Sequence, residues 1–410
     1  MLSKNKNNLF SVILLIIIIL INLFLPLERS NLKFKIGPTE LNYSLILNLI
    51  LFFLLILNGE FRKNIKIYFQ TILCRLEILF VISMTISLFF TLSTVFFGIH
   101  LILLYINSYI IMIFIFMFII EETNIKTIIN IFSICLILFS LIGILEFFFE
   151  FIFPFYHNLY SDYFKDSYNF AMNFGSKRAF GSLGHPLLFS NMLILFLPII
   201  WLERNNLVKI LTISLIILGV ISGNSRTSIF LLGFILLLYV FKSRIQIKLF
   251  IIFISILSPI MIINIVPDLY NMIFIRIEGF GSDASSLGRL LWLTAGFSRI
   301  NTQPFINDIF GNGIGASKEI LFQQIVTTWP TFDNNYMLIT ITIGFFGLLI
   351  YLLKYIYIVK NLIQKKEFDL FIGVILFLLM GFSFDTLHYT AIILPHSFLI
   401  ALSIKKKAIT

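Results

Sequence analysis

Long apolar runs, separated by short charged segments, follow one another along almost the whole chain. Most runs have about 17–25 residues, the length that an α-helix needs to cross the hydrocarbon core of a membrane. The pattern predicts an all-α polytopic membrane protein with about 12 transmembrane helices. We expect these spans at residues 10–26, 41–58, 74–96, 99–120, 127–153, 183–202, 208–222, 227–241, 249–266, 334–353, 368–384 and 389–403.

One long polar interval, residues 267–332, interrupts this pattern. No other stretch is both long and polar enough to form a separate soluble domain. We therefore predict a single integral membrane domain over residues 1–410, with 267–332 as a large loop between the ninth and tenth spans.

The positive charges set the predicted orientation. Most of the 30 Lys and Arg residues, Lys354 among them, fall in segments that would share one side of the membrane. Because cytoplasmic loops are enriched in Lys and Arg, both termini are predicted to be cytoplasmic and the 267–332 loop external. Arg75 and Glu77 would lie near the cytoplasmic end of the third span, where they could pair or snorkel.

Composition supports this class and argues against others. Hydrophobic residues make up 59% of the chain and charged residues only 12%, well below the charged fraction of soluble proteins. The net charge of +10 does not indicate nucleic-acid binding, because the basic residues mark helix ends and form no continuous face. Cys74 and Cys135 lie in apolar runs, and the histidines lack helical metal-ligand spacing. We expect no metal and no cofactor.

The first candidate for chemistry is the segment that begins Arg178-Ala-Phe-Gly-Ser-Leu-Gly-His185-Pro, just before a span. Its glycines allow a tight turn or a close approach to a ligand, and Pro186 suits the first turn of a helix. The start of that helix also offers unpaired N–H groups to an anion. The alternative is an interfacial arginine beside an ordinary helix start.

The second candidate is Gly223-Asn-Ser-Arg226, which separates two short apolar runs. Arg226 has no acidic neighbour in the sequence, and a charge deep in a membrane costs about 2.5–3.5 kcal/mol on insertion scales. An anion, backbone carbonyls or a water-filled cavity should offset that cost. The alternatives are a tight external turn with a solvated arginine, and a broken helix pair that does not fully cross.

The third candidate is the long loop itself. Gly288-Arg289-Leu-Leu-Trp292 is typical of the start of an amphipathic helix running toward Ile300, and Arg289 and Arg299 need not point the same way. Gly311-Asn-Gly-Ile-Gly315 does not follow a strand and lacks a phosphate-binding fingerprint, so we interpret it as a re-entrant turn.

Asp333-Asn-Asn-Tyr336 lies at the expected outer mouth of the tenth span. Asp333 could cap the helix that follows, or it could orient or deprotonate a sugar hydroxyl. Asn334, Tyr336 and the nearby Trp329 are candidate sugar-binding residues. Several external arginines with one or two acid–base candidates fit an anionic, lipid-linked ligand, because the guanidinium fork matches phosphate oxygens bidentately.

These motifs, in this order and spacing, resemble the O-antigen polymerase (Wzy) and O-antigen ligase superfamily over roughly residues 170–355. The matching pieces are Arg178-Ala-Phe-Gly-Ser-Leu-Gly-His185-Pro, Ser222-Gly-Asn-Ser-Arg226-Thr-Ser, Gly288-Arg289-Leu-Leu-Trp292 with Gly311-Asn-Gly-Ile-Gly315, and Asp333-Asn-Asn-Tyr336 with Gly344-Phe-Phe-Gly347-Leu-Leu.

The resemblance implies a metal-independent glycosyltransferase that uses a glycan linked to undecaprenyl pyrophosphate. An acceptor hydroxyl would attack the anomeric carbon, and the lipid pyrophosphate would leave. Arg178, Arg226 and Arg289 would bind the pyrophosphate, and Arg289 would also neutralise charge that grows on the leaving group. Asp333 or His185 would serve as the base.

The ligase branch of the superfamily typically has a histidine near the start of the span after the large loop. Here Asp333-Asn334 stands at that position, which favours a repeat-unit polymerase for an O-antigen or capsule. The alternatives are a ligase and, from another class, a flippase for the same lipid-linked oligosaccharide. The expected location is a bacterial plasma (inner) membrane. The expected partners are membrane lipid and the lipid-linked oligosaccharide, with a chain-length regulator and a flippase as further candidates, and no nucleic acid.

Overall fold

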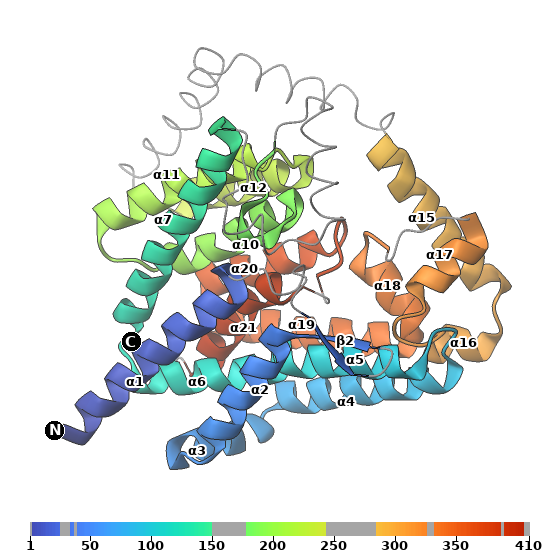
Figure 1. The fold of residues 1–410 in the computed structure, drawn as a ribbon, viewed down its shortest axis with the longest axis horizontal. Helices are drawn as coiled ribbons and strands as arrows, with labels where there is room; N and C mark the ends of the chain where they lie inside the picture. Colours follow the sequence, from blue (N-terminus) through green and yellow to red (C-terminus); the bar gives the residue numbers. More distant parts are fainter. Residues whose placement is uncertain are drawn as a thin grey trace.

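The computed structural model describes residues 2–24, 33–36, 39–149, 178–242, 284–325, 332–386 and 389–405, most of which are helical (Figure 1). In chain order the elements are α1 (Leu2–Ile19), the π-helix η1 (Leu20–Phe24), β1 (Lys33–Ile36), β2 (Thr39–Asn42), α2 (Tyr43–Ile56), α3 (Gly59–Phe69), α4 (Ile72–Ser87), the 3-10 helix η2 (Leu88–Phe90), α5 (Val95–Tyr105), the π-helix η3 (Ile106–Ile111), α6 (Met112–Glu122), α7 (Ile125–Phe149), the 3-10 helix η4 (Gly181–Leu183), α10 (Pro186–Ile200), α11 (Asn206–Ser222), α12 (Arg226–Lys242), α15 (Ala284–Thr302), α16 (Phe305–Phe310), α17 (Ser317–Ile325), α18 (Asn335–Thr342), α19 (Gly344–Gln364), α20 (Phe368–Met380) and α21 (Thr390–Lys405).

Strands form only a small part of the described structure. β1 and β2 pair as an antiparallel hairpin, with Lys33 opposite Asn42 and Ile36 opposite Thr39. The other described residues form helices and their connections. The helical class predicted from the apolar runs is confirmed.

Several helices are suited to a lipid environment. Four helical stretches in the described residues are long and apolar enough to cross a membrane: Ile72–Phe90, Val95–Glu122, Ile125–Phe149 and Gly344–Gln364. Shorter apolar helices, α10, α11, α12 and α20 among them, accompany these. Large apolar side chains such as Leu79, Ile82 and Phe89 point outward, which water would disfavour and lipid tolerates. The chain is a helical membrane protein.

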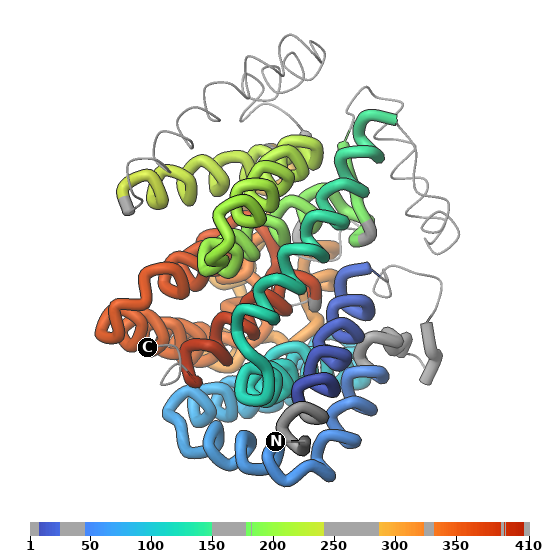
Figure 2. The backbone as a smooth tube through the Cα atoms, turned by 90° about the vertical axis from the view of Figure 1, so that its left-hand side faces the viewer, coloured from blue at the N-terminus to red at the C-terminus, as the bar shows by residue number. Residues whose placement is uncertain are grey.

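The C-terminal helices pack against helices from distant parts of the sequence. In Figure 2 the C-terminal helices α19–α21, coloured orange to red, lie between the N-terminal helices and the α10–α12 group. The contacts agree: α19 packs on α4, α21 packs on α6, and α10 packs on both α20 and α21. Every residue of α10 is buried, so this apolar helix is the centre of its group.

Each predicted span in the described residues contains a helix, but the tenth span is two helices instead of one. The apolar run at 334–353 is divided into α18 and α19 by Gly344, whose φ is 87°. The chain turns there because α16 ends against it: a Cβ on Gly344 would collide with the carbonyl of Ile309. The predicted span 249–266 lies outside the described residues, as do 267–283 and 326–331 of the predicted loop.

Because the apolar run is broken at Gly344, Lys354 lies at a different position from the one that the sequence predicts. The sequence places it on the cytoplasmic side, just after a span, and that prediction is wrong. α19 extends to Gln364, and Lys354 lies near its middle with a fully buried side chain. Glu77 is also fully buried and pairs with Lys354, while Arg75 is exposed, so Glu77 neither snorkels nor pairs with Arg75.

Gly344→Ala should destabilise the protein. An alanine at positive φ is strained by about 1–3 kcal/mol, and its Cβ would also collide with the backbone of α16. Gly233→Ala is the matched control, because Gly233 lies in α12 with open space around it, where alanine favours the helix. Thermal unfolding in detergent should show a lower Tm for Gly344→Ala only. Equal Tm values for the two variants would contradict the role of this break.

Candidate functional site

The segment that carries Arg178 is attached to the turn that carries Arg226. The N–H of Ala179 donates to the carbonyl of Ser222, the last residue of α11, with an N–O distance of 2.8 Å. The chain then turns through Asn224, at a φ of 46°, and α12 begins at Arg226. Two arginine-bearing segments that are far apart in sequence therefore lie side by side.

Close packing fixes this contact. Gly223 lies so near Ser190 of α10 that a Cβ at this position would overlap the serine hydroxyl. The Ser228 hydroxyl donates to the Asn191 side chain at 2.8 Å, which joins the starts of α10 and α12. The Gly223–Arg226 turn is thus a rigid contact between helices, and Arg226 itself is partly exposed.

His185 has a structural role at the start of α10. Its Nδ1 accepts the N–H of Leu187 at 3.3 Å, so the imidazole caps the helix before Pro186. Gly184 precedes it with a φ of 65°, the left-handed backbone that glycine allows. A neutral ring that accepts at Nδ1 carries its proton at Nε2, so the other edge of His185 is a hydrogen-bond donor.

Glu146 of α7 is a residue that the sequence analysis missed. Its Oε2 accepts the backbone N–H groups of Phe180 and Gly181 at 2.8 and 2.7 Å, and its side chain is buried. The carboxylate therefore holds the chain between Arg178 and His185 against α7. A signal was present in the sequence, since Glu146 is an acidic residue inside an apolar span, where polar groups are rare and usually functional.

Arg289 and Asp333 form the second part of the site. Arg289 lies in α15 and Asp333 directly before α18, and the guanidinium Nε is 3.7 Å from the carboxylate Oδ2. The side chains of Arg289 and Asp333 are 33% and 18% exposed. Asp333 does not cap α18, because Asn334 does so by accepting the N–H of Met337 at 2.9 Å.

Asn334 and Tyr336 are bonded within the protein. The Asn334 amide donates to the carbonyl of Phe382 at 3.0 Å, and the Tyr336 hydroxyl donates to the carbonyl of Leu378 at 2.7 Å. Burial raises the pKa of Tyr336 to about 12, so its hydroxyl stays protonated and is no base at neutral pH. Their sugar-binding role remains a prediction, and Trp329 lies outside the described residues.

The segment between α20 and α21 joins the two parts of the site. The Phe384 ring lies 6.3 Å from the His185 ring, measured between centroids. Three residues earlier, the carbonyl of Gly381 accepts the N–H of Asn335 at 2.7 Å. The starts of α10 and α18 therefore face one short segment, Gly381–Phe384.

Arg299 and the Gly311–Gly315 turn lie apart from these groups. Arg299 donates through Nη2 to the side chain of Asn312 at 2.8 Å, so Arg289 and Arg299 do point to different partners. Asn312 is fully buried, and its amide also donates to Gln303 and to the carbonyl of Ile341. These bonds make the turn a structural junction between α15, α16 and α18.

The electrostatic arrangement suits an anion. Arg226 begins α12, where the helix dipole adds positive potential to the guanidinium. Arg178 is fixed beside the same turn. Among the described residues, no group of three or more His, Cys, Asp or Glu side chains is arranged to hold a metal ion. What the site offers chemically is guanidinium groups for an anion and a carboxylate that can accept a proton.

Glu146→Leu should loosen the Phe180–Gly181 backbone. Two buried N–H groups would lose their acceptor, and an unsatisfied buried group costs about 1–3 kcal/mol. Hydrogen exchange at these two amides should therefore accelerate roughly 10- to 100-fold. Glu146→Gln is the matched control, because its amide oxygen can accept both bonds. Hydrogen exchange read by mass spectrometry over residues 178–185 measures the effect. Exchange in the leucine variant at the wild-type rate would remove Glu146 from this role.

Comparison with known families gives one match. No curated protein matches the chain. Residues 187–352 match the model of the family described as O-antigen ligase, a range that contains Arg226, Arg289 and Asp333 and starts two residues after His185. Residues 187–352 are therefore similar to the O-antigen ligase family, which confirms the resemblance to the O-antigen polymerase and ligase superfamily.

Proposed function

We propose that this protein is a repeat-unit polymerase for an O-antigen or capsule polysaccharide. It transfers a growing glycan from undecaprenyl pyrophosphate onto a lipid-linked repeat unit at the outer face of a bacterial plasma membrane. The observation that carries the proposal is the family domain at residues 187–352, which encloses two of the three candidate arginines and the Arg289–Asp333 pair.

The proposed topology follows the charge distribution. The chain is one membrane domain of about twelve spans with both termini in the cytoplasm, and the 267–332 loop is external. α19 then serves as the tenth span, and α18 is a short helix at its outer end. This orientation puts α15, Asp333 and the Gly223–Arg226 turn on the face where lipid-linked glycan is exposed.

The proposed reaction is a displacement at the anomeric carbon of the donor. The acceptor hydroxyl oxygen forms the new glycosidic bond, the bond from that carbon to the pyrophosphate oxygen breaks, and the pyrophosphate keeps the electron pair. Arg178 and Arg226 bind the pyrophosphate, and Arg289 counters the charge that develops as it leaves. The hydroxyl proton passes to a base.

Asp333 suits the base better than His185 does. The His185 Nδ1 already accepts the N–H of Leu187, which leaves an N–H donor on its other edge. Asp333 is partly exposed beside Arg289, and the N-cap residue of α18 is Asn334.

The choice of polymerase over ligase rests on the residue at the start of α18. The ligase branch typically has a histidine there, and this chain has Asp333-Asn334. The ligase remains the nearest alternative. The flippase is disfavoured because the unusual arginines gather near helix ends and in one loop, whereas transporters place polar groups at the bilayer midplane.

Purified protein in proteoliposomes tests the function directly. A single lipid-linked repeat unit is supplied as both donor and acceptor, and the products are separated by size. A polymerase should produce a ladder of lipid-linked oligomers. A ligase should leave the repeat unit unchanged until a different acceptor is added. Transbilayer movement of the repeat unit without any transfer would instead establish a flippase.

Arg226→Ala should abolish the ladder without removing the protein from the membrane. Arg226→Lys should also be poor, because a point charge cannot replace the bidentate fork on phosphate. Arg204→Ala is the control, since Arg204 is an exposed arginine at the opposite end of α11. Size separation of the glycan in membranes with equal protein amounts gives the readout. Normal chain length in both Arg226 variants would remove this residue from the site.

A further inference from the structure

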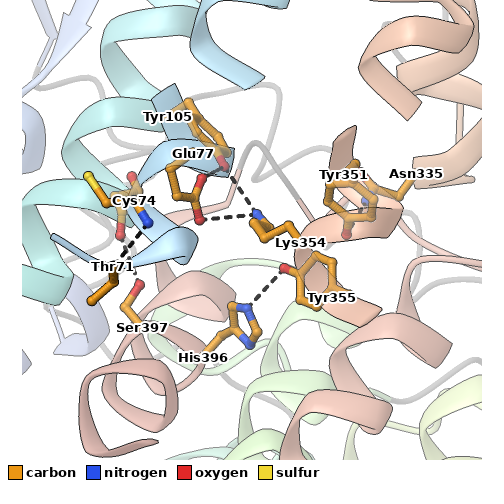
Figure 3. Close-up of polar contacts among 11 residues, drawn as sticks. Thr71, Cys74, Glu77, Tyr105, Asn335, Tyr351, Lys354, Tyr355, His396 and Ser397 are labelled. Atoms are coloured by element: carbon orange, nitrogen blue, oxygen red, sulfur yellow. Dashed lines mark hydrogen bonds and ion pairs between the residues drawn. The ribbon is translucent and has the colours of Figure 1, made fainter. Parts of the chain in front are cut away.

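A buried ion pair joins α4 and α19 outside the candidate site. Glu77 of α4 and Lys354 of α19 lie 3.3 Å apart, from carboxylate Oε1 to ammonium Nζ, and both side chains are fully buried (Figure 3). The Tyr105 hydroxyl bonds both charges, since it donates to Glu77 Oε2 and accepts from Lys354 at 3.2 Å. The described structure thus has a closed three-residue polar cluster between α4, α5 and α19.

Aromatic rings enclose the ammonium group. Lys354 Nζ lies 4.7–5.7 Å from the ring centroids of five aromatic residues, within the range of cation–π attraction. The rings belong to Phe80, Tyr105, Tyr109, Tyr351 and Tyr355. The ammonium therefore has a defined position and is not a mobile side chain.

Stability alone does not explain such a pair. Replacing a buried ion pair by apolar residues of similar volume is often neutral or stabilising, whereas removing one partner is costly. Apolar residues would also join two helices inside a membrane protein without the cost of burying charge. The pair does determine the orientation of the helices, because an ion pair with a bridging hydroxyl fixes the rotation of α19 about its axis relative to α4.

The rotation of α19 is transmitted to α18. Tyr351 lies one turn before Lys354 on the same buried face, and its hydroxyl accepts the side-chain N–H of Asn335 at 3.0 Å. Asn335 is the first residue of α18, is fully buried and follows Asp333 by two positions. A turn of α19 would therefore move the anchor of the segment that carries Asp333.

We propose that Glu77 and Lys354 are positioning residues for the transferase site. They fix the rotation of α19 and, through the Tyr351–Asn335 hydrogen bond, the place of Asp333 opposite Arg289. This inference rests on the proposed function, since it assigns the pair to the geometry of that reaction. A small misplacement of a reacting group lowers the rate of the chemical step, whereas it has less effect on the affinity for the substrate.

The test uses a variant that removes the cluster without leaving an orphaned polar group. Glu77→Met, Lys354→Met and Tyr105→Phe are combined, and the full-length protein is assayed in proteoliposomes with the lipid-linked repeat unit. The expected result is a Tm at or above the wild-type value with kcat lowered about 10- to 100-fold and KM nearly unchanged. Hydrogen exchange at the amides of Asn335 and Met337 should accelerate about 10-fold.

Two further variants sharpen the test. Tyr351→Phe keeps both charges and removes only the hydroxyl, so it should lower kcat and accelerate the same amides. Glu121→Gln with Lys405→Met is the matched control, because this ion pair of 2.6 Å also joins two helices but is partly exposed. The control should change neither kcat nor exchange at α18.

Wild-type kcat and exchange in the cluster variant would overturn the inference. If the cluster variant fails to fold, the Tyr351→Phe variant is the test. Wild-type kcat and wild-type amide exchange in Tyr351→Phe would then overturn the inference. Failure of the proposed function would appear differently, as wild-type protein that transfers no glycan. In that case, accelerated exchange at α18 in the cluster variant would still establish the coupling between α19 and α18. Unchanged exchange in that variant would show that the two helices are not coupled.

Discussion

The crossing of α4 and α19, closed by Glu77, Lys354 and Tyr105, is the interaction around which the helices are arranged. A charge inside a membrane costs about 2.5–3.5 kcal/mol on insertion scales, so a lysine and a glutamate there require each other. Aromatic residues from α4, η3 and α19 converge on the ammonium. Because α19 is held in this way, the short helix α18 has a defined place at the start of α19. The carboxylate of Asp333, directly before α18, then has a defined place too.

The candidate site is built from three helix starts, two of which contact one connection. α10 starts at His185–Pro186, α12 at Arg226, and α18 after Asp333, with Gly381–Phe384 between the first and the last. Helix starts combine backbone N–H groups with a favourable dipole for anions, and arginines nearby strengthen that preference.

Much of the fold follows from the sequence, because each long apolar run among the described residues contains a helix. The segments with Arg178, Arg226, Arg289 and Asp333 were also recognisable, since charged residues at the ends of apolar runs stand out. The pattern could not show that an apolar run is broken at Gly344, because the cause is α16, which crosses it from a distant part of the chain. It therefore misplaced Lys354. The pairing of Glu146 with the Phe180–Gly181 backbone and the cap by Asn334 likewise depend on contacts that periodicity does not contain.

Deletion of the gene, followed by separation of the surface glycan by size, tests the central claim in the cell. A repeat-unit polymerase predicts that the ladder collapses to core plus a single repeat unit and returns when the wild-type gene is restored. Loss of every glycan band, with long polymer still attached to undecaprenyl pyrophosphate, would contradict the polymerase and establish a ligase. Accumulation of single repeat units on the cytoplasmic side would contradict the enzyme altogether and establish a flippase.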